Sequence, residues 1–255
     1  MNIEENVPVI AVVGCGFIGS HLADELPKLC FSQDILPFKF RFIDYDTWEE
    51  RNAANQHVSQ VIAKKEELKA ITCARYAEAY SFNKSEAITE KLTGENAKRL
   101  IGDTILVIDA VDNIPTRQLM WGMAKAGVSG PCMHTGISRK GEGIINWSSP
   151  KFDTFPFKPN DVAGRDLKNQ DFKEPPCEMY KYRSAGMSLV QTIAKATSFF
   201  FGKDPWGMFT ETTPERGTMT CWSTDSDGSH IFTDAMFMTE EGFFPECFPM
   251  PLQKD

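Results

Sequence analysis

A glycine-rich turn near the amino terminus is the feature that most constrains how this chain can fold. Residues 7–14 form a continuous run rich in β-branched side chains, which is typical of a strand buried on both faces of a parallel sheet. Glycines follow in the spacing G-x-G-x-x-G, at Gly14, Gly16 and Gly19. Apolar residues then recur at helical spacing, at Ile18, Leu22, Leu26 and Leu29. The pattern predicts a strand, a tight turn and a helix that packs back on the strand.

Strand-like and helix-like runs continue to alternate through the first part of the chain. Strands are expected over residues 38–46, 103–112 and 141–147. Helices are expected over residues 58–72 and 115–127. This alternation predicts a Rossmann-like, doubly wound α/β sheet that is largely parallel.

The second part of the chain has a different pattern. Residues 148–183 are dominated by Pro, Asp, Asn and Lys without a sustained period, which predicts a long irregular crossover loop. A helix and then C-terminal antiparallel strands are expected within residues 184–255, with Asp227 and Gly228 at a hairpin turn. We expect residues 1–255 to form one domain, with residues 1–147 as its first half.

Composition limits the partners and the location. The net charge of -8 opposes non-specific binding to nucleic acid. No apolar run approaches the roughly 20 residues that cross a bilayer, and the acidic amino terminus is unlike a secretory signal. We therefore expect a cytoplasmic protein without nucleic-acid or membrane partners. Seven cysteines without a C-x-x-C pair predict reduced thiols. The histidines lack the spacing of metal ligands and are expected to be structural: His21, His57, His134 and His230.

The glycine turn and a following acid predict a nucleotide site. Gly14 permits a tight turn, Gly16 lets the backbone approach a phosphate, and Gly19 lets the helix pack closely. Asp44 ends the second expected strand, where the ribose-binding acid of such folds belongs. The alternative is a tight turn that binds no ligand.

The polar segment after Asp44 favours a triphosphate over a dinucleotide. Its candidate phosphate-binding residues are Arg51, Asn52, Asn55 and Gln56, followed by Lys64 or Lys65. A carboxylate that attacks a phosphate meets another anion, and at about 4 Å each charge pair costs roughly 4 kcal/mol at an effective dielectric near 20. Cations and amides offset that repulsion and steady a leaving pyrophosphate, whereas hydride transfer develops little charge near the phosphates. The alternative is a solvated helix start that is capped by asparagine.

Two acids after the third expected strand are candidates for a metal site. Asp109 and Asp112 belong at the carboxyl end of the sheet, where α/β proteins bind ligands. Mg²⁺ typically takes one or two carboxylates together with phosphate oxygens, so we predict that Asp112 is a Mg²⁺ ligand with Asn113 beside it. The alternative for Asp112 is the N-cap of the helix that contains Pro115.

Together these motifs resemble the adenylating domain shared by ThiF, MoeB and the ubiquitin-activating enzymes. The resemblance covers residues 9–147 well and 175–202 more weakly. It implies ATP and Mg²⁺ as cofactors, a homodimer, and residues 1–147 as the nucleotide-binding half of a ThiF-type domain. The implied substrate is the C-terminal glycine carboxylate of a ubiquitin-like or sulfur-carrier protein, which becomes an acyl-adenylate. The implied site residues are Gly14, Gly16, Gly19, Asp44, Asn52, Gln56, Lys65 and Asp112.

The chain also departs from the pattern of that family. Asn55 stands where the family usually has a phosphate-binding arginine, so either Arg51 substitutes from one helical turn away or the phosphate grip is weaker. The family's glycine before the lysine is replaced by Ile62 or Ala63, which leaves Lys64 and Lys65 as alternatives. Paired zinc cysteines are missing, so no zinc is inferred.

The cysteines divide into two expected kinds. Cys177 lies in the irregular loop, where related enzymes carry a cysteine that in some members accepts the acyl group, and a thiolate there could attack the adenylate. Its alternative is an inert thiol. Cys15 and Cys132 flank expected strands and are predicted to be small core residues.

Two other functions are consistent with the residues. The chain resembles in part the non-catalytic half of a heterodimeric activating enzyme, and Asn55 in place of the arginine is the best support for that reading. A glycine turn of this kind also fits an NAD-dependent oxidoreductase.

Overall fold

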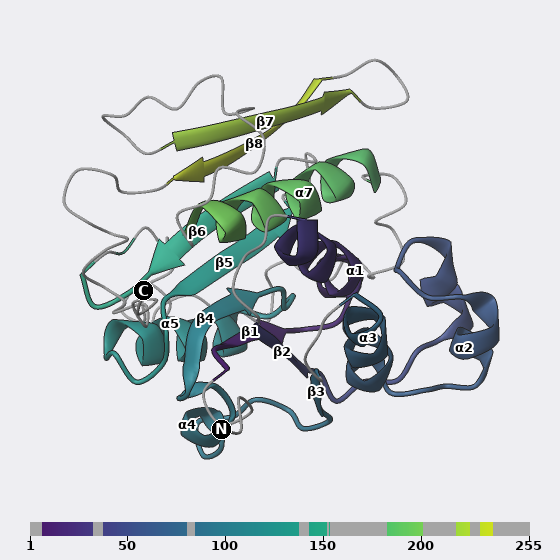
Figure 1. Ribbon diagram of the computed structural model, residues 1–255, viewed down its shortest axis with the longest axis horizontal. Coiled ribbons are helices and arrows are strands. Elements are labelled where there is room, and N and C mark those ends of the chain that lie inside the picture. Colours follow the sequence, from purple (N-terminus) through teal and green to yellow (C-terminus); the bar gives the residue numbers. More distant parts are fainter. Residues whose placement is uncertain are drawn as a thin grey trace, which may run out of the picture.

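The structure is a computed structural model that describes residues 7–32, 38–80, 85–137, 143–151, 153, 183–200, 218–224 and 230–236. Within these residues an eight-stranded sheet has the order β3-β2-β1-β4-β5-β6-β8-β7 (Figure 1). The strands are β1 (Val9–Val13), β2 (Lys39–Ile43), β3 (Glu86–Ile88), β4 (Thr104–Asp109), β5 (Cys132–Ile137), β6 (Gly143–Ser148), β7 (Thr218–Thr224) and β8 (His230–Met236). Pairing is parallel except between β5 and β6 and between β7 and β8. The predicted doubly wound, largely parallel sheet with C-terminal antiparallel strands is confirmed.

Helices cover both faces of the sheet. They are α1 (Phe17–Ser32), the 3-10 helix η2 (Glu50–Ala54), α2 (Gln60–Lys64), α3 (Lys69–Glu78), α4 (Ala97–Ile101), α5 (Ile114–Lys125) and α7 (Arg183–Phe200). One hydrophobic cluster joins the sheet to α1, α3 and α7, and a second joins it to α4 and α5 (Figure 1). Two layers of helices therefore enclose the parallel part of the sheet.

Strand β1 shows why its sequence is a continuous apolar run. Ile10 and Val12 belong to the cluster under α1, α3 and α7, whereas Ala11 and Val13 belong to the cluster under α4 and α5. All four side chains are buried. Because successive side chains point to opposite faces, a strand covered on both faces must be apolar at every position.

The helix predicted over residues 58–72 is wrong, because the structure has two helices there. α2 ends at Lys64 and α3 begins at Lys69, and between them Glu66 adopts a left-handed conformation with φ of 52°. The backbone between the helices pairs with the chain after β2. The Trp48 N–H donates to the Glu67 carbonyl, and the Lys69 N–H donates to the Asp46 carbonyl, both at 2.9 Å. These long-range bonds outweigh the local helical preference.

The later part of the chain agrees with prediction where it is described. α7 and the antiparallel pair β7 and β8 confirm the expected helix and hairpin strands. Most of the predicted crossover loop over residues 148–183 and the hairpin turn at Asp227 and Gly228 lie outside the described residues. In the described segments, no helix is both long and apolar enough to span a bilayer.

Candidate nucleotide-binding site

The glycine turn joins β1 to α1, and its glycines meet different demands. Gly14 has φ of 92°, a conformation that favours glycine, and a Cβ there would lie 2.8 Å from the carbonyl oxygen of Ala110. A Cβ at Gly19 would collide with the carbonyl oxygen of Gly14. At Gly16 a Cβ would meet nothing within 4 Å. The first and third glycines are thus required by packing, whereas Gly16 borders open space.

Asp44 follows β2 and is tied to the glycine turn. Its Oδ2 accepts a 2.6 Å hydrogen bond from the backbone N–H of Cys15, and its Oδ1 accepts a 2.8 Å bond from the N–H of Asp46. Burial raises the pKa of Asp44, and these two bonds and the charge of Lys69 oppose that shift. The carboxylate therefore stands at the junction of the two strand ends, as the sequence predicts.

The polar segment after Asp44 forms η2 and the residues that follow it. Glu49 is the N-cap of η2, and the Asn52 side chain at position N3 accepts a 2.8 Å bond from the Glu49 N–H, which completes a capping box. The alternative of a solvated helix start capped by asparagine is therefore wrong for Asn52. Asn52, Asn55 and Gln56 are all buried. Oε1 of Gln56 is buried without a hydrogen-bond partner among the described residues. A buried acceptor of this kind is unusual, since buried polar groups are normally paired.

Arg51 lies apart from these buried amides. Its Nε is 2.5 Å from the Glu49 carboxylate, and both side chains are more than half exposed. An arginine paired with a neighbouring carboxylate adds little net positive charge to a phosphate site. The structure therefore places the candidate Arg51 on the rim, where its charge is already compensated.

A lysine that the sequence analysis does not single out lies beside the acids that follow β2. Lys64 and Lys65 are exposed at the end of α2. Lys69, the first residue of α3, has its Nζ 3.4 Å from the carboxylate of Asp46. Sequence reasoning missed Lys69. The sequence carries no local signal for the turn before Lys69, because Glu66 adopts a left-handed conformation without the glycine that usually marks one.

The two acids after β4 differ in exposure: Asp112 is exposed and remains a ligand candidate, whereas Asp109 is buried. Asn113 is the N-cap of α5, because its side chain accepts a 3.0 Å bond from the Thr116 N–H. The cap therefore does not involve Asp112, which is exposed. The negative charge of Asp46 is the largest cause that raises the pKa of Tyr45. Burial and the charges of Asp44 and Asp112 raise this pKa further. Carboxylates after β2 and β4 thus share one neighbourhood.

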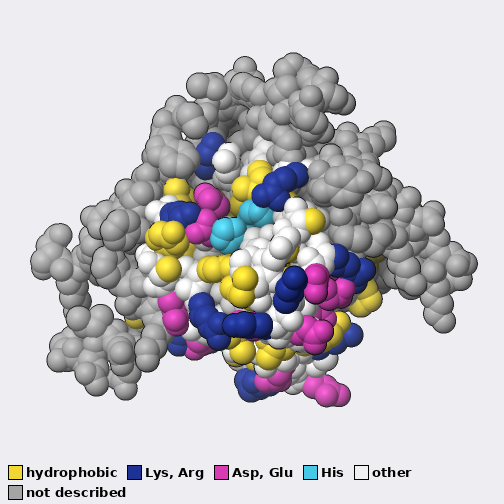
Figure 2. Space-filling view, turned by 90° about the vertical axis from the view of Figure 1, so that its right-hand side faces the viewer, with side chains coloured by type: hydrophobic (Ala, Val, Ile, Leu, Met, Phe, Trp, Pro, Cys, Tyr) yellow, Lys and Arg dark blue, Asp and Glu magenta, His cyan; other side chains and the backbone are white. Residues whose placement is uncertain are grey.

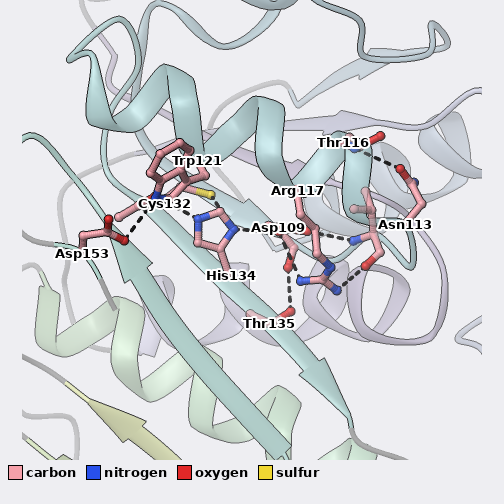
Figure 3. Close-up of polar contacts among 11 residues, drawn as sticks. Asp109, Asn113, Thr116, Arg117, Trp121, Cys132, His134, Thr135 and Asp153 are labelled. Atoms are coloured by element: carbon pink, nitrogen blue, oxygen red, sulfur yellow. Dashed lines mark hydrogen bonds and ion pairs between the residues drawn. The ribbon is translucent and has the colours of Figure 1, made fainter. Parts of the chain in front are cut away.

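Asp109 is the centre of a buried polar network (Figure 3). The Arg117 guanidinium donates to Asp109 Oδ2 at 3.2 Å and also to the carbonyl of Val111. Nδ1 of His134 lies 2.8 Å from the same carboxylate oxygen, and its Nε2 lies 2.8 Å from the Ser148 hydroxyl. The network joins α5, β5 and β6 to the loop that carries Asp112. It holds that loop in place.

Asp109, His134 and Ser148 are hydrogen-bonded in series, as are the acid, histidine and serine of a serine hydrolase. All three residues are buried, and Ser148 has no exposed surface. A nucleophile must reach its substrate, so this serine is not in a position to act as one. We interpret the relay as a structural support, because its members satisfy one another's hydrogen bonds.

His21 and His57 form an aromatic cluster beside the glycine turn. The His21 ring lies 4.6 Å from Phe17 and 5.5 Å from His57 between centroids, and His57 lies 4.9 Å from Tyr76. Figure 2 shows histidine side chains at the surface of this face, with basic and acidic side chains beside them. Burial lowers the pKa of His21 to about 4. These contacts are packing contacts, and the His21 ring is neutral at pH 7.

The structure tests the predictions for two of the cysteines and does not test the prediction for Cys177. Cys15 and Cys132 are buried, and burial raises the pKa of both thiols. They are the core residues that the sequence predicts. Cys177 lies outside the described residues, so its expected acyl-carrying role stays a prediction.

The residues present fit a nucleotide with Mg²⁺ better than a metal held by protein alone. In the described part of the chain, no group of three metal-binding side chains is found. Mg²⁺ needs only one or two carboxylates when phosphate oxygens complete its shell. Asp112 is exposed and would be such a carboxylate, and the open space at Gly16 leaves room for phosphate oxygens.

The fold and the site define a doubly wound α/β protein whose glycine turn, strand-end acids and polar segment meet at the carboxyl ends of β1, β2 and β4. Comparison with known families finds that the ThiF family matches residues 6–155, which is more than half of the chain. The chain belongs to the ThiF family.

Other comparisons bear on the fold alone. A search of curated proteins finds no match. The crystal structure of selenomethionine PaaA is similar with a TM-score of 0.51 and 16% sequence identity, over 90% of this chain and 64% of that chain. The chain therefore spans somewhat less than two thirds of the length of PaaA, and the likeness supports the α/β architecture.

Proposed function

We propose that this chain is an ATP- and Mg²⁺-dependent adenylyltransferase that activates the C-terminal carboxylate of a ubiquitin-like or sulfur-carrier protein. The observation that carries the proposal is the junction of Asp44 with the glycine turn, through its 2.6 Å bond from the Cys15 N–H. Membership of the ThiF family supports it. A cytoplasmic homodimer that binds neither nucleic acid nor membrane is part of the same proposal.

The glycine turn and Asp44 would hold the nucleotide. Gly16 leaves room for a phosphate, and the amino end of α1 presents backbone N–H groups and a favourable dipole to anionic oxygens. Each carboxylate oxygen of Asp44 accepts one bond from the backbone and has the capacity for another, so acceptor sites remain for ribose hydroxyls. Gly14 and Gly19 would shape the turn.

The charges around the phosphates would come from several elements. We assign the main lysine contact to Lys69, because its ammonium already lies beside the acids that follow β2. Lys64 and Lys65 would serve as peripheral cations. Asn55 and Gln56 would offer amide groups, while Asn52 would hold η2 in shape.

Asp112 would be the carboxylate ligand of Mg²⁺. The ion would neutralise phosphate charge when bound. Asp112 is suited to this role because it is exposed and because Asn113 takes over the cap of α5. Arg117 and Asp109 would keep the loop in one conformation.

The reaction would form one bond and break one. A carboxylate oxygen of the protein partner would bond to the α-phosphorus while the bond to pyrophosphate breaks, which gives an acyl-adenylate. Positioning and electrostatic stabilisation by the residues above would supply the rate. In a second step the Cys177 thiolate would take the acyl group and release AMP.

The first experiment measures ATP binding and then ATP–pyrophosphate exchange. Calorimetric titration of the full chain with Mg·ATP and with NADH should show binding of ATP only. Exchange should appear when a ubiquitin-like protein with a Gly-Gly terminus is added. Lys69→Met should reduce exchange much more than Lys64→Met or Lys65→Met. A chain that binds ATP but gives no exchange with saturating partner would contradict catalysis, and preference for NADH would support an oxidoreductase instead.

A second candidate is the non-catalytic half of a heterodimeric activating enzyme. Asn55 in place of an arginine and the compensated charge of Arg51 favour it. It predicts a stable complex with a second, complete homologue. In that complex Asp112→Ala would leave the activity unchanged, whereas an enzyme that uses its own site would lose it.

A further inference from the structure

Arg183, the first residue of α7, reaches back to the polar segment. Its Nη1 donates a 3.1 Å hydrogen bond to the backbone carbonyl of Asn55, although the two residues lie 128 positions apart in the sequence. The Arg183 side chain is exposed, so its guanidinium lies at the rim of the protein and not in the core. The contact brings a cation from the later part of the chain to the candidate phosphate-binding residues.

The packing of α7 on α1 fixes where Arg183 stands. A Cβ at Gly186 would collide with the ring of Phe17, so the first turn of α7 lies directly against the first residue of α1. Figure 1 shows the two helices side by side. The amino end of α1 is the helix end toward which the glycine turn leads, and it attracts anions. Arg183 therefore stands beside the place where phosphates would bind.

The polar segment over residues 51–56 supplies no uncompensated positive charge of its own. Arg51 pairs with Glu49, and Asn55 is neutral. The charge of Arg183 reaches His21 on α1. Burial is the main cause that lowers the pKa of His21, and the charges of His57 and Arg183 lower this pKa further. A bound polyphosphate would offset that positive charge.

We propose that Arg183 is a polyphosphate-binding residue of this site. The inference rests on the proposed function and adds the cation that neither Asn55 nor Arg51 supplies. The bond to Asn55 uses one of several N–H donors, and the planar guanidinium has others with which to contact phosphate oxygens in pairs. Because α7 lies beyond residues 6–155, the part of the chain outside the family match would complete the nucleotide site.

The test compares Arg183→Gln with Arg51→Gln as a matched control in the full chain. Calorimetric titrations with Mg·ATP, Mg·ADP and AMP should show that Arg183→Gln weakens ATP and ADP binding by about 10- to 100-fold, as expected for lost hydrogen bonds to charged groups. AMP should bind with nearly unchanged affinity, because it lacks the outer phosphates. Arg51→Gln should change each affinity by less than about 3-fold. Arg183→Lys should fall between, since it keeps the charge and loses the planar fork.

The outcomes separate this inference from the proposed function. Wild-type protein that binds ATP and supports exchange, with Arg183→Gln equal to it in ATP affinity, would overturn the inference alone. If Arg183→Gln weakened AMP binding as much as ATP binding, the inference would also be overturned. Arg183 would then act only by holding the backbone at Asn55. Wild-type protein without ATP affinity would overturn both. Thermal unfolding checks that Arg183→Gln is folded, and Arg183→Lys carries the comparison if it is not.

Discussion

The imidazole of His134 and the carboxylate of Asp109 lie 2.8 Å apart with both side chains buried. Arg117 donates to the same carboxylate, so one acid satisfies two buried partners. Removing one member of a buried charged network leaves the others without compensation, which typically costs about 3–5 kcal/mol. We expect Asp109→Ala to lower the free energy of unfolding by that amount in urea titrations. The exposed Asp112→Ala should change it by less than about 0.5 kcal/mol. Equal stabilities of the two variants would contradict this account of the network.

Two glycines of the turn should respond differently to alanine. Gly14→Ala imposes a strained φ and a contact of 2.8 Å with the Ala110 carbonyl, so we expect a loss of at least about 1–3 kcal/mol in unfolding free energy. Gly16→Ala meets nothing within 4 Å and should fold with nearly wild-type stability. Its methyl group should nevertheless weaken ATP binding, measured by calorimetry, because it enters the space expected for a phosphate. A stable Gly14→Ala, or Gly16→Ala with unchanged ATP affinity, would count against the site geometry.

Neighbouring residues at the start of α5 should separate metal binding from helix capping. Asp112→Asn should leave the melting temperature unchanged and abolish the Mg²⁺ dependence of ATP binding, measured by titration with and without the ion. Asn113→Ala should lose the cap to Thr116 and cost about 1 kcal/mol of stability. It should keep the Mg²⁺ dependence. If Asn113→Ala loses that dependence while Asp112→Asn keeps it, the assignment of the ligand is reversed.

The stability of the fold should depend on pH through His21. Its pKa is about 4 in the folded protein, chiefly because of burial, against an unfolded value of about 6.5. The unfolded chain therefore binds the proton more readily, and stability falls as the pH falls from about 6.5 to about 4. Between pH 7 and pH 5 this histidine should account for a loss of about 2 kcal/mol. His21→Gln should remove that share of the loss in urea titrations at the two pH values. An identical loss in wild type and variant would show that His21 titrates normally.

Much of the frame could be predicted because its signals are local. The apolar run of β1, the spacing from Gly14 to Gly19 and the acid at the end of β2 each lie within a short stretch of sequence. Asn113 illustrates the limit of such signals. Two polar residues precede the helix, and only the geometry shows which of them accepts the bond from Thr116.

The features that could not be predicted depend on contacts between distant parts of the chain. The break before α3 arises because residues 67 to 69 pair with the backbone after β2, and a helical pattern carries no trace of that pairing. The prediction of Lys64 or Lys65 as the phosphate-binding lysine does not take this break into account, and it stays a prediction beside the proposal of Lys69. The approach of Arg183 to Asn55 and that of His134 to Asp109 arise likewise from packing.

The close fit of Phe17 against Gly186 has a consequence for how the protein can change. The Phe17 ring fills the volume that any side chain at position 186 would need. The start of α7 therefore packs directly on the residue that follows the glycine turn. Position 186 is consequently restricted by a side-chain ring, whereas Gly14 and Gly19 are restricted by backbone atoms. In a library of variants that remain folded, a larger residue at position 186 should occur only together with a smaller residue at position 17.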